Sequence, residues 1–147
     1  MKKAFTALVI IFIINVLSLY YGWDLKWAWF DVVMHFSGGL FVAMLMAVYL
    51  KEYLRNGEII KNVLIVVGAT VFIGVVWEFA EYLGNQTLTE SAYHWFGIRT
   101  YFMGDLDDTI IDLMMDTLGA LAFISLHSLW RRYSHKEETL TQNYSNS

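Results

Sequence analysis

The amino-acid sequence predicts an all-α, polytopic membrane protein, a bundle of four transmembrane helices. Of its 147 residues, 57% are hydrophobic and 17% are aromatic, and the mean hydropathy of +0.46 is well above that of an ordinary soluble domain. The apolar residues form four runs, each long enough to cross a hydrocarbon layer of about 30 Å as a helix. No proline interrupts these runs. They also lack the period-two alternation of a β-barrel and the polar faces of a soluble helical bundle.

The first run covers residues 4–22 and is interrupted by Thr6, Asn15 and Ser18. At about 1.5 Å per residue, this length crosses the hydrocarbon layer as one helix. The preceding lysines are also typical of the start of a signal peptide, but residues 20–23 do not form a small-residue cleavage site. We therefore expect this segment to remain attached.

The other three spans are predicted at about residues 29–53, 60–84 and 108–130. All four belong to a single domain, residues 1–133, and the polar tail that follows, residues 134–147, is expected to be disordered. The connection between spans three and four, residues 85–104, is rich in aromatic residues, which favour the membrane interface. It either covers the outer face of the bundle or simply tethers the two spans.

Basic residues are distributed unevenly along the chain. Eight of the ten flank the two termini and the loop between spans two and three, namely Lys2, Lys3, Lys51, Arg55, Lys61, Arg131, Arg132 and Lys136. Lys26 and Arg99 fall on the opposite side of the predicted membrane. Because Lys and Arg are enriched in cytoplasmic loops, this distribution places both termini in the cytoplasm.

Composition excludes several functional classes. The chain has no cysteine, which excludes disulfides, thiolate metal sites and cysteine nucleophiles. The net charge is −4, and no cluster of basic residues with interleaved aromatic residues is present, so no nucleic-acid partner is expected. The sequence contains no phosphate-binding glycine loop, nucleophile elbow or metalloprotease helix motif. Any ligand chemistry therefore depends on oxygen and imidazole groups.

Seven ionisable residues lie in the outer halves of the predicted spans: Asp31, His35, Glu78, Glu81, Asp108, Asp112 and Asp116. A charged group in hydrocarbon costs roughly 2.5 to 3.5 kcal/mol, so such residues usually line a cavity, pair with one another or bind a ligand. Spans two, three and four each carry some of the seven at a similar depth, and on each span they share a helical face with a glycine. We therefore expect these side chains to meet in one polar pocket.

Ordinary structural roles are an alternative explanation for some of these residues. Asp31 and Asp108 lie near helix N-termini, where a carboxylate caps the helix or complements its dipole. This explanation does not extend to Asp112 and Asp116, which lie one and two turns deeper. The two glutamates lie near a helix C-terminus, where the dipole disfavours negative charge, although the outer one is close enough to water to snorkel.

The predicted pocket combines six carboxylates with one imidazole, that of His35. So many negative charges cannot all remain ionised in a low-dielectric site. Either several carboxylates are protonated or a bound cation balances them, and we favour a divalent metal ion held by residues of this set. Oxygen ligands with one imidazole suit Mg, Mn, Zn or Fe. A single histidine is often a core residue, but His35 follows Asp31 by one helical turn and is a candidate ligand or proton carrier.

Short motifs in a fixed order resemble a known family. They are Phe30-Asp31 with His35-Phe36 and Gly39, then Trp77-Glu78 with Glu81, then Gly104-Asp105, Asp108-Thr109, Asp112 and Gly119-Ala120. The pattern resembles the YjdF-like inner-membrane proteins of bacteria and is more distantly similar to VanZ-like proteins, which are linked to glycopeptide resistance. The resemblance covers about residues 30–120. It implies a multi-pass protein of the bacterial plasma membrane with a polar pocket, and it implies no reaction. The chain departs from the pattern in its smaller number of spans and its added Asp116.

Three functions remain open at this level. An enzyme acting on a membrane lipid or lipid-linked cell-envelope substrate would use Glu78, Asp112 and His35 as acid/base groups or metal ligands. A cation or proton transporter would use the carboxylates as a relay, although the inner halves of the spans carry no carboxylate except Glu52, at the inner end of span two, to continue the path. A non-enzymatic binding or assembly protein would use the polar cluster only to fix helix packing.

Overall fold

The computed structural model describes residues 1–54, 57–97, 102 and 105–145, with the backbone alone described for residues 24, 25, 28 and 131–145. Within these ranges all regular secondary structure is helical, which confirms the predicted all-α class. Arg55 and Arg99 of the predicted charge distribution, and Gly104 of the third motif, lie outside the described residues.

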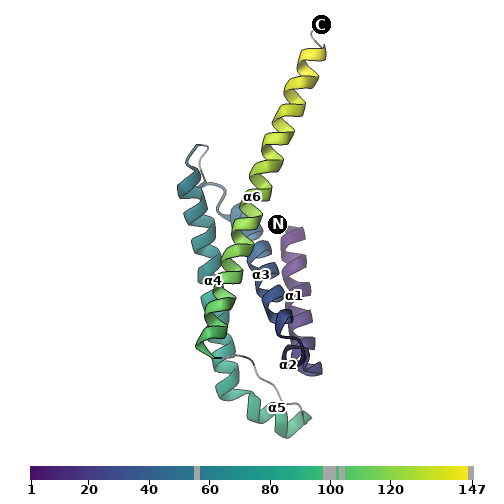
Figure 1. Cartoon of the computed structure of the whole chain (residues 1–147), viewed down its shortest axis with the longest axis vertical. Coiled ribbons are helices and arrows are strands. Elements are labelled where there is room, and N and C mark those ends of the chain that lie inside the picture. The colour runs from purple at the N-terminus through teal and green to yellow at the C-terminus, as the bar shows by residue number, and fades with distance from the viewer. Residues whose placement is uncertain (55–56, 98–101, 103–104, 146–147) are drawn as a thin grey trace.

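The described part of the chain contains four helices long and apolar enough to cross a membrane (Figure 1). They are α1 (Lys2–Tyr21), α3 (Ala28–Tyr49), α4 (Ile59–Thr87) and the first part of α6 (Leu106–Ser145), and the short helices α2 (Trp23–Lys26) and α5 (Thr89–Phe96) lie between them. At most 22% of each apolar window is buried inside the protein. Most apolar side chains therefore face outward, as expected for helices surrounded by lipid.

Helix α3 ends earlier than predicted, at Tyr49 rather than near residue 53. A turn follows, in which the Tyr53 backbone N–H donates to the carbonyl oxygen of Leu50. The polar pair Lys51 and Glu52 ends the apolar run at this point, so continued helix would have no further apolar surface to place in the membrane. Helix α4 instead runs three residues beyond its predicted end at residue 84, to Thr87.

The expectation of a disordered tail is wrong for the part of the tail that is described, because α6 continues as one helix to Ser145. Figure 1 shows this extension projecting well away from the other helices. No glycine or proline follows Gly119 in the sequence, so nothing in the backbone chemistry stops a helix that has already formed. The polar composition of the tail predicted disorder, but a polar composition does not prevent a packed helix from continuing into the tail.

Helix α3 is the centre of the bundle and packs against α1, α4 and, most extensively, α6. Two glycines make the α3–α6 contact possible. A methyl group at Gly39 would overlap the backbone carbonyl oxygen of Asp116 and lie 2.6 Å from its Cα. A methyl group at Gly119 would likewise overlap the carbonyl oxygen of Phe36. The two backbones therefore touch, as in other membrane helix pairs with small residues at the interface.

Helix α1 is peripheral. Among the described residues its backbone approaches those of α2 and α3 but not those of α4 or α6. Figure 1 shows α1 on the outer side of α3, with its first residues beside the middle part of the bundle. Three helices, α3, α4 and α6, therefore form the compact unit that carries the ionisable residues.

The described part of the connection between α4 and α6 stays close to α4. Helix α5 approaches α4 and no other helix of the described chain. Farther along, the Phe102 backbone N–H donates to Asn85 Oδ1 at 2.8 Å, and the Phe102 ring lies over Gly84. These contacts hold the returning chain at the end of α4, as expected if the connection only tethers the two spans. In its described residues, the connection does not lie over α3.

Candidate functional site

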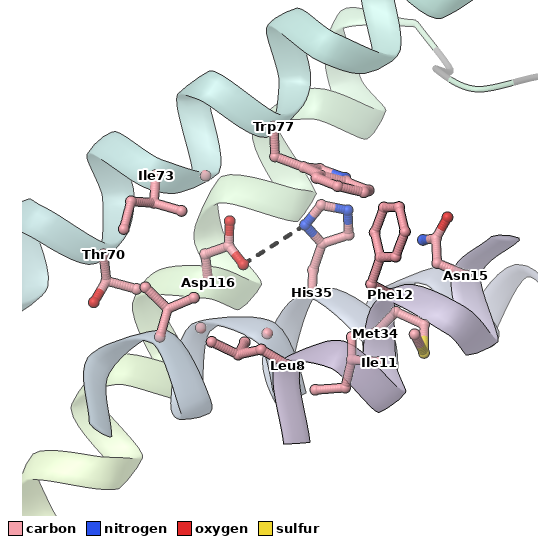
Figure 2. Close-up of a pocket in the computed structure, with 14 residues that line it drawn as sticks. Leu8, Ile11, Phe12, Asn15, Met34, His35, Thr70, Ile73, Trp77 and Asp116 are labelled. Atoms are coloured by element: carbon pink, nitrogen blue, oxygen red, sulfur yellow. Dashed lines mark ion pairs between the residues drawn. The ribbon is translucent and has the colours of Figure 1, made fainter. Parts of the chain in front are cut away.

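His35 is the centre of the predicted polar pocket. It lies on α3, where its side chain is buried at the contact with α6. Its Nε2 atom is 3.8 Å from Asp31 Oδ1 and 3.8 Å from Asp112 Oδ1, and its Nδ1 atom is 3.6 Å from Asp116 Oδ1. Figure 2 shows the Asp116 carboxylate on one side of the imidazole and the Phe12 ring on the other. One imidazole thus lies within 4 Å of three carboxylates that belong to two helices.

Asp31, His35 and Asp112 form the first candidate metal group. Asp31 and His35 are one turn apart on α3, and Asp112 comes from α6, with one ligand atom of each residue within 4.8 Å of the others. Ligand atoms bound to a tetrahedral divalent ion at about 2.1 Å lie roughly 3.4 Å apart. The distances of 3.8 Å from His35 to each carboxylate are close to this value. Small side-chain movements would therefore bring all three residues onto one ion.

Glu78 and Glu81 of α4 form a second group with the same histidine. Glu81 Oε1 accepts a hydrogen bond of 2.8 Å from the Trp77 indole N–H. Glu78 is buried, and its Oε1 atom has no hydrogen-bond partner among the described residues. Because the two groups share His35, the site draws ligands from α3, α4 and α6 together.

The structure places the remaining candidates differently. Asp116 joins the cluster from its inner side through His35 Nδ1. Asp108 lies one turn outward from Asp112, is half-buried, and belongs to neither metal group. Asp105 accepts hydrogen bonds at Oδ1 from the backbone N–H groups of Asp107 and Asp108, at 3.1 and 3.2 Å. Asp105 therefore acts as the cap that begins α6.

Asp116 is held in place by glycines of both neighbouring helices. Gly39 of α3 contacts its backbone, and a methyl group at Gly74 of α4 would overlap its Oδ2 atom. The carboxylate thus fills the space that a larger residue at position 74 would occupy. The prediction that each acidic face carries a small residue for close approach is confirmed for Gly74 of α4 and Gly119 of α6, whereas on α3 the close contact lies at Gly39 and not at Gly38, which shares the face of His35.

A cavity of about 280 Å³ adjoins the cluster on the inner side of His35. Its walls come from α1, α3 and α4, with Asp116 contributed by α6. Leu8, Phe12 and Asn15 line it from α1, and Ile73 and Trp77 line it from α4 (Figure 2). No role was predicted for α1. Asn15, one of three polar residues in its apolar run, was the available signal that this helix borders the site.

A family model matches the chain over residues 2–133. The family is described as predicted membrane proteins, DUF2238, and the match includes all four spanning helices and every residue of the cluster. No curated protein and no solved structure gives a match. The chain therefore belongs to the DUF2238 family of predicted membrane proteins.

Proposed function

We propose that this protein binds a divalent metal ion in the membrane, between α3, α4 and α6, with Asp31, His35 and Asp112 as its first ligands. One observation carries the proposal. Asp112 is only 2% exposed, and its Oδ1 atom faces the imidazole without a hydrogen-bond donor among the described residues. A buried carboxylate oxygen normally has a donor or a cation. When the imidazole is neutral, as in a metal ligand, a metal ion supplies the missing cation.

The glutamates of α4 support the same proposal. Glu78 Oε1 is also buried without a donor in the described chain, and Glu78 and Glu81 form a second group with the shared histidine. Each oxygen that loses water in this way costs several kcal/mol if nothing replaces it. A cation near His35 would be within reach of carboxylates from three helices, and a second ion would fit the second group.

Elemental analysis tests this proposal. Wild-type protein purified in detergent is expected to carry about one ion of Mg, Mn, Zn or Fe per chain. The Asp112→Asn, Glu78→Gln double variant keeps the size of both side chains but removes their negative charges, so its metal content should fall below about a tenth of the wild-type value.

A matched control tests whether the loss of metal depends on removing charge at the site or on removing charge anywhere in the protein. Asp107→Asn with Glu90→Gln makes the same two chemical changes at exposed positions of α6 and α5. This control should retain the wild-type metal content. Equal, negligible metal in all three proteins after loading with each ion and dialysis would reject the proposal.

A second candidate function is an enzyme that acts on a membrane lipid or lipid-linked cell-envelope substrate. The adjoining apolar cavity favours this function, because the cavity has space for a hydrocarbon chain next to groups capable of acid/base chemistry. His35, Glu78 and Asp112 are the proposed catalytic groups. The resemblance to VanZ-like proteins agrees with an envelope substrate only by analogy. Lipid profiles of cells expressing wild-type protein or Asp112→Asn should differ in at least one lipid class if this function is present.

Transport and assembly are weaker alternatives. On the inner side of Asp116, the Thr70 hydroxyl donates to the carbonyl oxygen of Val66 in its own helix, and no carboxylate follows in the inner halves of the spanning helices as the structure describes them. A relay would therefore end near the middle of the membrane. Cation flux into liposomes above the rate of Asp112→Asn would favour transport. Absence of flux, metal and lipid changes together would leave an assembly role.

The orientation is also a proposal. We expect a bacterial plasma-membrane protein with both termini cytoplasmic, because the basic residues concentrate at the termini and in the loop before α4. An alkaline phosphatase fusion after Asn85 should be active, and a fusion after Ser147 should be inactive. A green fluorescent protein fusion should give the reverse pattern. Phosphatase activity at Ser147 would contradict the orientation.

A further inference from the structure

The cavity beside His35 lies at the middle depth of the bundle. Its lining residues fall near the centres of the spanning helices, from Leu8 on α1 to Ile73 on α4. Its volume of about 280 Å³ is far larger than one water molecule needs. A space of this size next to a buried polar cluster has room for a ligand larger than water.

The cavity is open to the side of the bundle. The backbone of α1 does not approach that of α4 in the described chain, and the wall between these helices consists of side chains. Phe12 of α1 meets Trp77 of α4 edge to face, with ring centroids 6.2 Å apart. Phe12 is 53% exposed and Ile73 is 37% exposed, although both line the cavity. The same side chains therefore contact the cavity and the surrounding hydrocarbon.

The walls suit hydrocarbon better than water. Leu8, Ile11, Val42 and Ile73 are apolar, whereas an ordered water needs two to four polar partners. The Thr70 hydroxyl is already bonded to Val66 at 2.9 Å, and Asp116 is paired with the imidazole. At this depth the phase outside the protein consists of acyl chains.

We propose that the cavity binds one acyl chain of a membrane lipid, which enters sideways between α1 and α4. The end of the cavity at Trp77 is nearer the carboxylate cluster, and the end at Leu8 and Val42 is deeper in the bundle. A chain with its methyl end at Val42 therefore has its headgroup on the side of the cluster. Binding of the acyl chain does not depend on the proposed metal site. Only the delivery of a headgroup phosphate to the cluster rests on that site.

Photolabelling provides a direct test. Protein is reconstituted in phosphatidylglycerol vesicles containing a trace of phosphatidylcholine with a diazirine midway along one acyl chain. After irradiation, labelled residues are mapped by mass spectrometry. Met34 lines the cavity and is only 8% exposed, so its labelling reports a chain inside. We expect Met34 to be labelled at least as strongly as Ile13, which is exposed on α1. Labelling of Ile13 without Met34 would overturn the proposal.

Two glycines allow a matched comparison. Gly38 lines the cavity, and a methyl group added there would have only Asp116 Oδ1 nearby, at 4.0 Å. Gly38→Leu should therefore fill the cavity without a backbone clash and reduce Met34 labelling about tenfold, which corresponds to about 1.4 kcal/mol of binding free energy. Gly68 on α4 has nothing within 4 Å and does not line the cavity. Gly68→Leu should leave Met34 labelling unchanged.

Additional variants distinguish failure of this proposal from failure of the metal site. Leu8→Trp fills the cavity from the peripheral helix and replaces Gly38→Leu if the latter aggregates. Unchanged Met34 labelling in a folded filling variant would reject chain binding and leave the metal proposal intact. Asp112→Asn with Glu78→Gln should lose metal and keep Met34 labelling. If wild-type protein is labelled at Met34 but holds no metal, the metal site alone is rejected.

Discussion

Replacing Gly39 by valine is expected to destabilise the bundle more than any other single change at a glycine of α3. The added methyl groups would overlap the Asp116 backbone, whose Cα and carbonyl carbon lie 2.6 and 2.7 Å from the position of a Cβ. Overpacking in a core typically costs 1 to 3 kcal/mol when side chains can move aside. Here the obstacle is backbone, so α3 and α6 must separate, and a loss of more than about 3 kcal/mol of unfolding free energy is expected.

Stability in detergent, measured by titration with sodium dodecyl sulfate, checks this result. Gly68→Val is the matched control because it makes the same change on an open face of α4. Both variants exchange glycine for the same β-branched residue in a helix, so their difference isolates the α3–α6 contact. Equal unfolding midpoints for the two variants would contradict the close approach of these helices.

Replacing His35 by leucine is expected to produce the second large effect. The imidazole lies within 4 Å of the carboxylates of Asp31, Asp112 and Asp116. Removing one partner from a buried ionic group typically costs about 3 to 5 kcal/mol, because the remaining charges lose their compensation. We expect a loss of this size in chelator-treated protein, in which no metal ion can replace the imidazole.

The same detergent titration measures this loss, and His127→Leu serves as its control. His127 lies on an exposed face of α6, stacked on Phe123, so its replacement should change stability little. The double variant His35→Leu, Asp112→Leu should lose less unfolding free energy than the two single variants lose together. The reason is that Asp112→Leu removes the charge that His35→Leu leaves unpaired. Strict additivity would show that the two side chains do not interact.

Sequence periodicity predicted the spans and much of the cluster, because it fixes the face and the depth of a residue on its helix. Asp112 and Asp116 lie too deep to cap α6, and both are buried against His35. Capping was predicted for Asp31 and Asp108, but α3 begins without a side-chain capping hydrogen bond, and the oxygen that caps α6 belongs to Asp105. Asp108 shares the face of Asp112, but neither metal group includes it.

Periodicity did not reveal which helices touch or where they cross. That arrangement depends on Gly39 and Gly119, whose missing side chains admit the opposing backbone. A glycine in an apolar run shows only that close approach is possible, and the partner must be found in three dimensions. For the same reason Asn15, a polar residue in the first span, could not by itself show that α1 borders a cavity. The end of α6 was missed because composition measures the tendency to bury surface, not the ability of a started helix to continue.

The peripheral position of α1 distinguishes it from the closely packed helices α3, α4 and α6. Backbone contact between α3 and α6 fixes the geometry around His35, and side chains alone join α1 to α4, where Phe12 meets Trp77. Outward swing of α1 would widen the space beside the imidazole without disturbing the distances among its carboxylates. Such a swing would let the cavity accept acyl chains of different width without changing the arrangement of the carboxylates around His35.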